Sequence, residues 1–402
     1  MMKKVISIVI ALTIMMSIAI PVSVSAVTKV AGVKQIGHST TSVEISWNRY
    51  NGADKYKIEY SDTATGSYTE DTSYNTDGTE SIYNLFAGVT YYVRVTPHVG
   101  NSWLTAAASE PFAVVTAPNS VSDLKQTNAT ASSITLSWSK SDGATSYNIY
   151  KHYSSDNIQK IGSTKSNSYT VKGLSNKKSL DFSYIYVYPV RSSGTYDAQG
   201  SYTSTSWYYN LRLAPPKGAA PKVGAYYYSS SNNVYFSRPD VKFQDGYQFK
   251  IYKTNSKKAV KTLTNETSCT LSKNQFYKVK TRSYAQIGGK KVWGKWSKFS
   301  YFVPGLKTIG VTSKSQHSVR IHWSKAKGGK IKYDIYVTKS YSKDLRKFKK
   351  NYKKTSIKVT KCGKRRLERN TYYYFYVKPK IKVGKKFKAS QVYNYVTTYT
   401  AY

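Results

Sequence analysis

Acidic residues are scarce in this sequence. Its 402 residues include 62 Lys and Arg but 20 Asp and Glu, which gives a formal net charge of +42. Residues 305–402 contain three acids and residues 216–304 contain another three: Asp334, Asp344 and Glu368, and Asp240, Asp245 and Glu266. So few carboxyl groups leave little material for the paired acids of general acid–base catalysis.

Motifs of common catalytic sites are also missing. The sequence has no Gly-x-Ser-x-Gly elbow, no His-Glu-x-x-His pair and no Walker loop. The nearest two of its five histidines, His317 and His322, are five residues apart. On a strand this odd spacing points the two side chains to opposite faces, which makes them poor joint metal ligands. We therefore expect a protein that is not an enzyme and that uses no metal or cofactor.

Cysteine is nearly absent. Cys269 and Cys362 are 93 residues apart and fall into different predicted domains. Small secreted domains stapled by disulfides carry many more cysteines. We expect two unpaired thiols.

Long apolar runs are limited to one, at the N-terminus. Lys3 and Lys4 precede the 16-residue run from Val5 to Ile20, and Val24-Ser25-Ala26 follows Pro21. This order is typical of a secretory signal with a small-residue cleavage site. The alternative is an uncleaved anchor, but the run falls short of the ~20 apolar residues that a spanning helix needs. We expect a signal peptide over residues 1–26 and a secreted or extracellular chain with no further membrane segment.

Tyrosine, in contrast, is abundant, with 40 residues. Tyr, Thr, Val and Ile favour pleated strands, and helix-forming Ala, Leu and Glu runs are missing after the N-terminus. The composition predicts an all-β protein.

The chain repeats itself. "SVEISWNRYNGADKYKIEY" and "SITLSWSKSDGATSYNIYK" both place a Tyr nine residues after a Trp, at Trp47 and Trp138. A third copy has Arg238 in the Trp position, and a fourth has Trp323 followed by Tyr at ten residues. These markers are 91, 100 and 85 residues apart, a period that suits small sandwich domains rather than solenoid units.

A second marker, Leu-x5-Tyr, follows the first. It places Tyr91, Tyr277 and Tyr373 six residues after a leucine. In the second copy the sequence leaves two counterparts open, Phe182 and Tyr184.

With these markers the chain resembles tandem fibronectin type III domains of the kind found in secreted bacterial proteins. The resemblance implies four antiparallel immunoglobulin-like β-sandwiches. It also implies that Trp47, Trp138 and Trp323 are core residues, and that Tyr91, Tyr277 and Tyr373 form tyrosine corners. Arg238 departs from the pattern and puts the packing of the third core in question.

Prolines lie between the copies at Pro118, Pro215-Pro216 and Pro304. Because proline does not continue a central strand, these positions predict the domain boundaries. The predicted domains are residues 27–117, 118–215, 216–304 and 305–402. The linkers are short, so we expect a monomeric, semi-extended rod.

Charge rises steeply along these four domains. Their net charges are −3, +5, +14 and +24, the last from 27 basic and three acidic residues. Such asymmetry suggests a polyanionic partner. The alternative is a solubilising surface with no target.

The candidate binding surface lies in the segment "NTYYYFYVKPKIKVGKKFK" of the fourth domain. If Tyr373, Phe375 and Val377 face the core, strand alternation turns their neighbours outward. The predicted patch contains Tyr336, Tyr374 and Tyr376, edged by Lys378, Lys380 and Lys382, with Lys385 and Lys386 in the following turn. The alternative is that these residues stabilise cross-strand pairs and protect an edge.

The leading hypothesis is a secreted, non-enzymatic adhesion or binding protein. Its basic C-terminal domains would hold an anionic cell-surface or wall polymer, such as teichoic acid, while the N-terminal domains project outward. Alternatives are glycan binding through the exposed tyrosines, extracellular nucleic-acid binding and a passive spacer. Nucleic acid is the weaker partner because no recognised nucleic-acid module is present.

Overall fold

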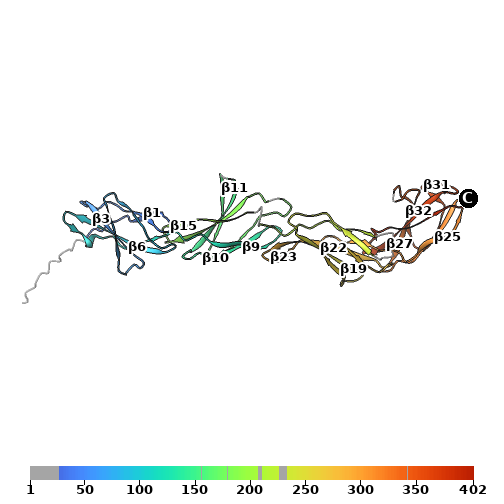
Figure 1. The fold of residues 1–402 in the computed structure, drawn as a ribbon, viewed down its shortest axis with the longest axis horizontal. Coiled ribbons are helices and arrows are strands. Elements are labelled where there is room, and N and C mark those ends of the chain that lie inside the picture. Colours follow the sequence, from blue (N-terminus) through green and yellow to red (C-terminus); the bar gives the residue numbers. More distant parts are fainter. Residues whose placement is uncertain (1–26, 155, 179, 207–210, 226–232, 342) are drawn as a thin grey trace, which may run out of the picture. The chain divides into compact units, whose positions relative to one another are not determined.

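The computed structural model describes residues 27–402 except 155, 179, 207–210, 226–232 and 342 (Figure 1). The predicted signal peptide lies outside the described residues. The described chain is built from antiparallel sheets with one short 3-10 helix, η1 (Thr105–Ala107). The all-β prediction is confirmed. In the described residues no helix is both long and apolar enough to cross a bilayer.

The sheets occur as four pairs, called here sandwich 1 to sandwich 4. Each pair combines a three-stranded and a five-stranded sheet. Sandwich 1 pairs β1 (Lys34–His38), β2 (Val43–Ser46) and β5 (Thr79–Ile82) with β4 (Thr69–Asn75), β3 (Lys55–Ser61), β6 (Thr90–Val99), β7 (Ser102–Trp103) and β8 (Phe112–Val115). Sandwich 2 pairs β13 (Ser168–Val171), β10 (Ile134–Ser139) and β9 (Ser122–Ala129) with β12 (Asn157–Thr164), β11 (Ser146–Ser154), β14 (Tyr184–Ser192), β15 (Asp197–Gln199) and β16 (Thr203–Ser206).

Sandwiches 3 and 4 follow the same order. Sandwich 3 pairs β17 (Lys222–Ala225), β18 (Asn233–Ser237) and β21 (Ser268–Thr270) with β20 (Ala259–Thr264), β19 (Gly246–Lys253), β22 (Tyr277–Ile287), β23 (Lys290–Trp293) and β24 (Ser300–Phe302). Sandwich 4 pairs β25 (Ile309–Ser315), β26 (Ser318–Trp323) and β29 (Ser356–Val359) with β28 (Arg346–Tyr352), β27 (Ile331–Thr338), β32 (Tyr372–Val383), β33 (Lys386–Ala389) and β34 (Asn394–Tyr399). A small hairpin, β30 (Lys361–Cys362) and β31 (Arg365–Arg366), is added to sandwich 4.

A Trp–Tyr pair recurs in three of the cores. Trp47, Trp138 and Trp323 meet Tyr56, Tyr147 and Tyr333 edge to face, with ring centroids 5.2, 5.2 and 5.3 Å apart. Each tyrosine hydroxyl accepts a hydrogen bond from a backbone N–H six or seven residues upstream. The nine- or ten-residue spacing in the sequence therefore reflects one packing unit, in which the tyrosine both fills the core and ties down the chain before its strand.

Sandwich 3 replaces this tryptophan by Arg238 and still has a core. The guanidinium carbon of Arg238 lies 4.4 Å from the ring centroid of Tyr247, and the side chain is 7% exposed. Its burial lowers the pKa of the guanidinium group. Phenylalanines fill the volume instead, because Phe236 packs against both Phe249 and Phe302. A cation over a tyrosine face thus takes the place of the aromatic pair.

The Leu-x5-Tyr markers also occupy buried positions. The hydroxyl of Tyr91 accepts a hydrogen bond from the Phe86 N–H, and that of Tyr373 accepts one from the Glu368 N–H, at 2.9 and 3.1 Å. Tyr277 is buried and stacks on Phe302. In sandwich 2 the open choice resolves to Phe182, which is 1% exposed, whereas Tyr184 is 39% exposed.

The chain forms two compact units. Unit 1 contains residues 27–119 together with residues 190–200, and unit 2 contains the described residues of 120–189 and 201–402. Within unit 1, the hairpin formed by the end of β14 and β15 packs on sandwich 1. The ring nitrogens of His38 lie 2.8 Å from the Tyr196 hydroxyl and 3.2 Å from the Gln199 carbonyl oxygen, and Ala198 packs with Val115 and Ala117.

Within unit 2, neighbouring sandwiches share cores. Ala285 and Ile287, at the end of β22, belong to the core of sandwich 2. Phe276, which precedes β22, lies in the core of sandwich 4, and Val392 from sandwich 4 lies in the core of sandwich 3. The Asn274 side chain accepts hydrogen bonds from the Lys307 N–H and the Ser324 hydroxyl across the same junction.

Candidate functional site

Strand β32 carries most residues of the predicted binding patch. Tyr373, Phe375 and Val377 point into the core of sandwich 4 and are at most 1% exposed. Tyr336 on β27 lies directly opposite Tyr376 in the register. Alternation therefore places the predicted patch on the outer face of the sheet, as the pleat requires.

Two members of the patch depart from the prediction. Tyr376 was expected to be exposed, but it is 3% exposed. Its ring is covered by Tyr374, Tyr393 and Tyr395, at centroid distances of 6.5, 6.0 and 5.2 Å. The aromatic residues of β34 and of the segment before it close over the outer face, so Tyr376 is a packing residue.

Lys380 was expected to be free to bind a ligand, but it is paired with neighbouring side chains of sandwich 4. Its ammonium nitrogen lies 3.3 Å from a carboxylate oxygen of Asp334 and donates to the Asn351 side chain at 2.8 Å. The side chains of Lys380 and Asp334 are 12% and 8% exposed. Asp334 also accepts from the Asn351 N–H at 2.8 Å. This buried pair holds β27, β28 and β32 together.

The other predicted residues keep some exposure. Tyr336, Tyr374 and Lys378 are half-buried, and Lys378 donates to the Tyr393 hydroxyl at 2.9 Å. Lys382, Lys385 and Lys386 are exposed where β32 turns into β33. The patch is therefore a tyrosine-covered sheet face with free lysines at one end.

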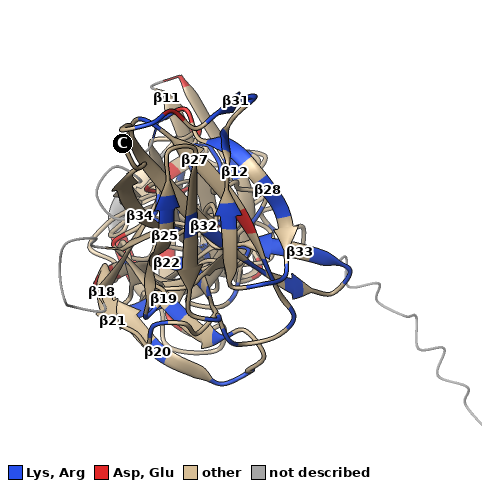
Figure 2. Cartoon of the chain, turned by 90° about the vertical axis from the view of Figure 1, so that its right-hand side faces the viewer, with Lys and Arg blue, Asp and Glu red and all other residues tan. Residues whose placement is uncertain are grey.

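A second cationic site in sandwich 4 was not predicted. A cavity of about 860 Å³, called here the hairpin pocket, lies between the end of β27, the start of β28 and the β30–β31 hairpin. Six cationic side chains line it: Lys339, Arg346, Lys347, Lys364, Arg365 and Arg366. The acids that line it are Asp344 and Glu368. Figure 2 shows the basic residues gathered along β28, β31 and β33.

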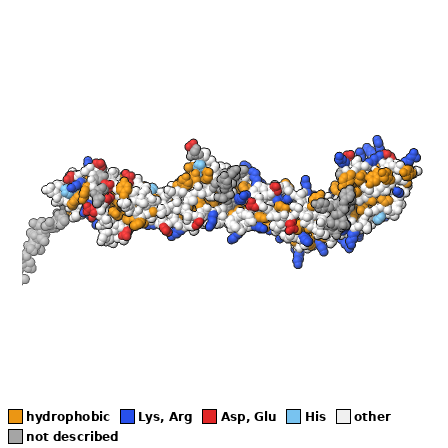
Figure 3. Space-filling view, in the orientation of Figure 1, with side chains coloured by type: hydrophobic (Ala, Val, Ile, Leu, Met, Phe, Trp, Pro, Cys, Tyr) orange, Lys and Arg blue, Asp and Glu red, His pale blue; other side chains and the backbone are white. Residues whose placement is uncertain are grey.

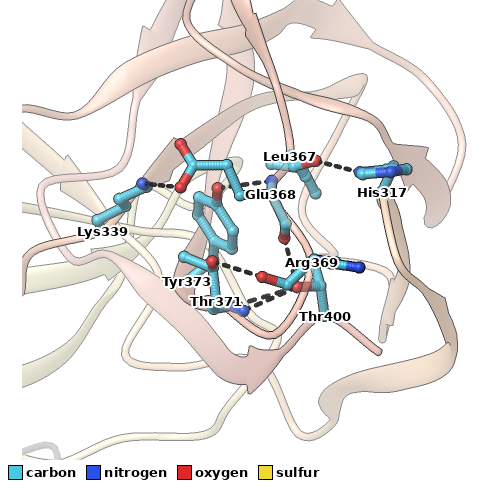
Figure 4. Close-up of polar contacts among 8 residues, drawn as sticks. All are labelled: His317, Lys339, Leu367, Glu368, Arg369, Thr371, Tyr373 and Thr400. Atoms are coloured by element: carbon cyan, nitrogen blue, oxygen red, sulfur yellow. Dashed lines mark hydrogen bonds and ion pairs between the residues drawn. The ribbon is translucent and has the colours of Figure 1, made fainter. Parts of the chain in front are cut away.

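Tyr373 and Glu368 of the tyrosine corner line the hairpin pocket, and Figure 4 shows the polar contacts that hold them. The Tyr373 hydroxyl accepts from the Glu368 N–H, and the Glu368 carboxylate accepts from Lys339 at 2.7 Å. This hydrogen bond raises the pKa of Lys339. A structural motif thus fixes the position of one cation, Lys339. A second, Lys347, lies with its ammonium 5.6 Å from the Tyr336 ring centroid.

The hairpin turn depends on a glycine. Gly363 has φ of +67°, a conformation that other residues adopt at a cost. A Cβ at this position would also lie 2.8 Å from the Arg346 Cδ. Gly363 therefore lets the hairpin approach β28 and brings Arg365 and Arg366 to the pocket.

In the described residues, the two cysteines and the histidines His317 and His322 have separate surroundings. Cys269 and Cys362 are free thiols, and burial raises the pKa of each. His317 bonds to the Leu367 carbonyl oxygen and His322 to the Thr312 hydroxyl. In the part of the chain that the structure describes, no three His, Cys, Asp or Glu side chains are grouped to hold a metal ion.

Comparisons with known proteins found two solved structures that the chain resembles at low identity. The chain is similar to a crystal structure of chicken CNTN1 FN1-FN3 domains, with 17% identity over 69% of this chain and 98% of that chain and a TM-score of 0.31. It is also similar to a two-domain fibronectin type III segment of chicken tenascin, with 16% identity over 44% of this chain and 97% of that chain and a TM-score of 0.23. No protein-family model and no curated protein matches the chain.

Strand order defines the fold of each sandwich. In every sandwich the fourth strand pairs with the third, and the third pairs in turn with a later strand of the same sheet: β6, β14, β22 or β32. The four sandwiches have the fibronectin type III fold. This fold hosts unrelated functions, so the sites on it, and not the fold, determine the ligand.

Proposed function

We propose that this chain is a secreted, non-enzymatic modular binding protein. It attaches through its basic C-terminal sandwiches to an anionic polymer of a cell surface or wall, such as teichoic acid, and leaves its N-terminal sandwiches available for other contacts. The observation that carries the proposal is the hairpin pocket, where six cations and two acids line one cavity.

The charge distribution supports this proposal. Residues 305–402 carry a net charge of +24 and residues 27–117 carry −3. Figure 3 shows Lys and Arg side chains crowded over sandwich 4, with Asp and Glu more frequent over sandwich 1. A surface of one sign raises the local concentration of oppositely charged polymers and speeds their association.

The experiment uses the full chain, because sandwich 4 shares its core with sandwich 3. Purified cell walls with and without teichoic acid are titrated with the wild type and with the triple variant K364Q/R365Q/R366Q. A matched control, K353Q/K354Q/K358Q, removes three exposed lysines from the same sandwich outside the pocket. We expect at least tenfold weaker binding by the triple variant and a smaller, general decrease in the control.

The salt dependence of the affinity can contradict the proposal. Affinity should fall linearly with the logarithm of salt concentration, because each neutralised phosphate releases counterions. At molar salt the Debye length is about 3 Å, so binding that persists there, or that survives removal of teichoic acid, contradicts the proposal.

Glycan binding through Tyr336, Tyr374 and Tyr376 is the second class of function. It would persist at high salt because ring stacking carries no net charge. The burial of Tyr376 and its contacts with Tyr393 and Tyr395 remove one of the three rings from this alternative.

A further inference from the structure

Sandwich 3 carries a row of cations interleaved with aromatic rings. On β22, Lys278, Lys280 and Arg282 alternate with core residues and face outward. Beside them runs "WGKWSKF", which places Trp293, Trp296 and Phe299 at every third position. These six residues are called here the aromatic–cation ladder.

The ladder results from a mismatch in spacing between two segments. The Gly294 N–H donates to Ser283, the Ser297 N–H donates to Thr281, and Ser300 pairs with Val279. Three residues of one segment therefore match two residues of β22. A side chain at every third position on one segment then falls between side chains at every second position on the other.

Ring and cation distances follow this register. The guanidinium carbon of Arg282 lies 3.9 Å from the Trp293 ring centroid and 4.4 Å from that of Trp296. The ammonium of Lys280 lies 4.7 Å from Trp296 and 5.4 Å from Phe299, and that of Lys278 lies 5.2 Å from Phe299. Tyr252 adds a further ring, 5.9 Å from the Lys278 ammonium and 5.6 Å from that of Lys280. Each cation thus lies near two or three rings and is half-buried.

The ladder concentrates like charge. Lys250 on β19 lies directly opposite Lys280, and like charges in that position destabilise a sheet. Burial lowers the pKa of Lys280, and the positive charges of Lys250, Arg282 and Lys278 lower it further. Among the described residues, the ion pairs of Asp240 and Asp245 go to Arg238 and Arg212 rather than to this row.

An anion would relieve this repulsion, and the geometry restricts its chemistry. Nucleobases bind single-strand platforms by stacking on free aromatic faces. Here Trp293, Trp296 and Phe299 already have Lys or Arg heads within 3.9–5.2 Å of their ring centroids. Arg282 also donates to the Gln248 side chain at 3.1 Å. The ammonium groups of Lys278 and Lys280 remain for phosphate oxygens, to which they can donate charge-assisted hydrogen bonds.

The row also has a regular spacing. Alternate residues of an antiparallel strand are about 6.8 Å apart, so Lys278, Lys280 and Arg282 present three cations in line. This matches a linear chain with an anionic group on successive units better than it matches a single compact anion.

We propose that the aromatic–cation ladder of sandwich 3 binds a linear phosphate-linked polymer that lacks nucleobases. This inference rests on the proposed function, for which it adds a second site in a different sandwich and a chemical class of ligand. The aromatic rings hold the cations in position, and the cations contact the polymer.

The test compares two probes by titration calorimetry of the full chain at 0.05 and 0.2 M salt: linear inorganic polyphosphate and poly(dT), matched in phosphate concentration. The ladder variant is K278Q/K280Q, and its control is K257Q/K258Q, two exposed lysines of the same sandwich outside the ladder. The pocket variant R365Q/R366Q is measured in parallel, and thermal unfolding verifies that each variant is folded.

We expect K278Q/K280Q to bind polyphosphate at least fivefold more weakly than K257Q/K258Q, and poly(dT) to bind no more tightly than polyphosphate. Equal binding by the ladder variant and its control overturns the ladder site. Tighter binding of poly(dT) that is lost in the ladder variant overturns the exclusion of nucleobases. If only the pocket variant loses affinity for polyphosphate, the ladder site is refuted and the proposed function stands. If both variants bind polyphosphate and cell walls as tightly as the wild type, the proposed function is refuted as well.

Discussion

At the scale of the residue, the Trp–Tyr pair explains most of what the sequence reveals about the fold. Tyr333 is buried, packs edge to face on Trp323 and accepts a hydrogen bond from the Ala326 N–H. Its ring and its hydroxyl therefore have separate roles. The ring contributes packing, and the hydroxyl satisfies a backbone donor that is out of reach of water.

The substitution Tyr333→Phe isolates the hydroxyl. It leaves the Ala326 N–H unpaired in the core, and we expect a loss of about 1–3 kcal/mol in the free energy of unfolding. Urea denaturation measures this loss. Tyr341→Phe is the control, because Tyr341 is 49% exposed; an equal loss in both variants contradicts the role of the buried hydrogen bond.

The same residue gives a pH dependence. Burial raises the pKa of Tyr333, so the unfolded chain releases this proton first as pH rises past about 10. The contribution of the neutral phenol is complete below pH ~10 and is lost as pH approaches the folded pKa. The stability gap between wild type and Tyr333→Phe should be constant from about pH 7 to 9 and narrow at about pH 11. A gap that widens at the alkaline end contradicts this.

Lys380 offers a test of the corrected patch. Lys380→Met leaves the Asp334 carboxylate buried without its cation, at an expected cost of about 3–5 kcal/mol. The double variant Asp334→Asn/Lys380→Met should recover most of this loss, because the introduced amide is neutral and its oxygen can still accept from the Asn351 N–H. Lys378→Met, which removes a more exposed lysine, should cost less than about 1 kcal/mol. Denaturant unfolding measures the loss in the free energy of unfolding for each of the three variants. Similar losses for Lys378→Met and Lys380→Met would contradict the buried ion pair and leave Lys380 available for binding.

At the scale of the element, strand β32 shows where pattern reasoning succeeds and where it stops. Alternation predicts which residues enter the core, because the pleat has a fixed period of two. It cannot predict that Tyr393 and Tyr395, which follow later in the chain, return to cover Tyr376. An outward position in a strand is fixed locally, whereas its exposure depends on what packs over it.

Three alanine substitutions in β32 separate these cases. Phe375→Ala and Tyr376→Ala should each cost about 3–5 kcal/mol, because both side chains are buried on opposite faces of the sheet. Tyr374→Ala should cost about 1–2 kcal/mol, because its ring is half-buried. Denaturant unfolding gives the order, and a Tyr376→Ala loss no greater than that of Tyr374→Ala contradicts the packing role.

The hairpin pocket and the aromatic–cation ladder escaped sequence reasoning for a related reason. The pocket joins Lys339 and Arg346 to a hairpin that comes well after them in the chain. The ladder requires a three-residue period in "WGKWSKF" to lie against a two-residue period in "KVKTR". The sequence does place Trp293, Trp296 and Phe299 at every third position. A period of three matches neither the period of two of a strand nor the 3.6 of a helix, so it predicts no regular element for this segment.

At the scale of the whole molecule, shared cores govern how unit 2 responds to change. Phe276 is fully buried in the core of sandwich 4 although it precedes β22 of sandwich 3. Phe276→Ala should therefore destabilise both sandwiches, by about 3–5 kcal/mol in total. In calorimetry of the full chain, sandwiches 3 and 4 should unfold in one combined transition, and Phe276→Ala should lower its midpoint temperature. Ile58→Ala, in sandwich 1, should lower the midpoint of a different transition. Separate unfolding of sandwich 4 alone contradicts the shared core.

Net charge acts at the same scale. Residues 305–402 carry +24, and self-repulsion opposes the compact state. Raising NaCl from about 0.05 to 0.5 M should raise the midpoint of the sandwich 3 and 4 transition by roughly 3–6 °C. The transition that Ile58→Ala identifies as sandwich 1 should move less, because residues 27–117 carry −3. Equal shifts in both transitions argue against charge repulsion as the cause.

The junction between sandwiches 3 and 4 also limits how this chain can be rearranged by recombination. Phe276 and Val392 each complete the core of the neighbouring sandwich. A gene segment that carried sandwich 4 alone into another protein would leave a hole where Phe276 belongs and expose Val392. The two most basic sandwiches are therefore expected to be inherited as a pair, together with the two cationic sites that they contain.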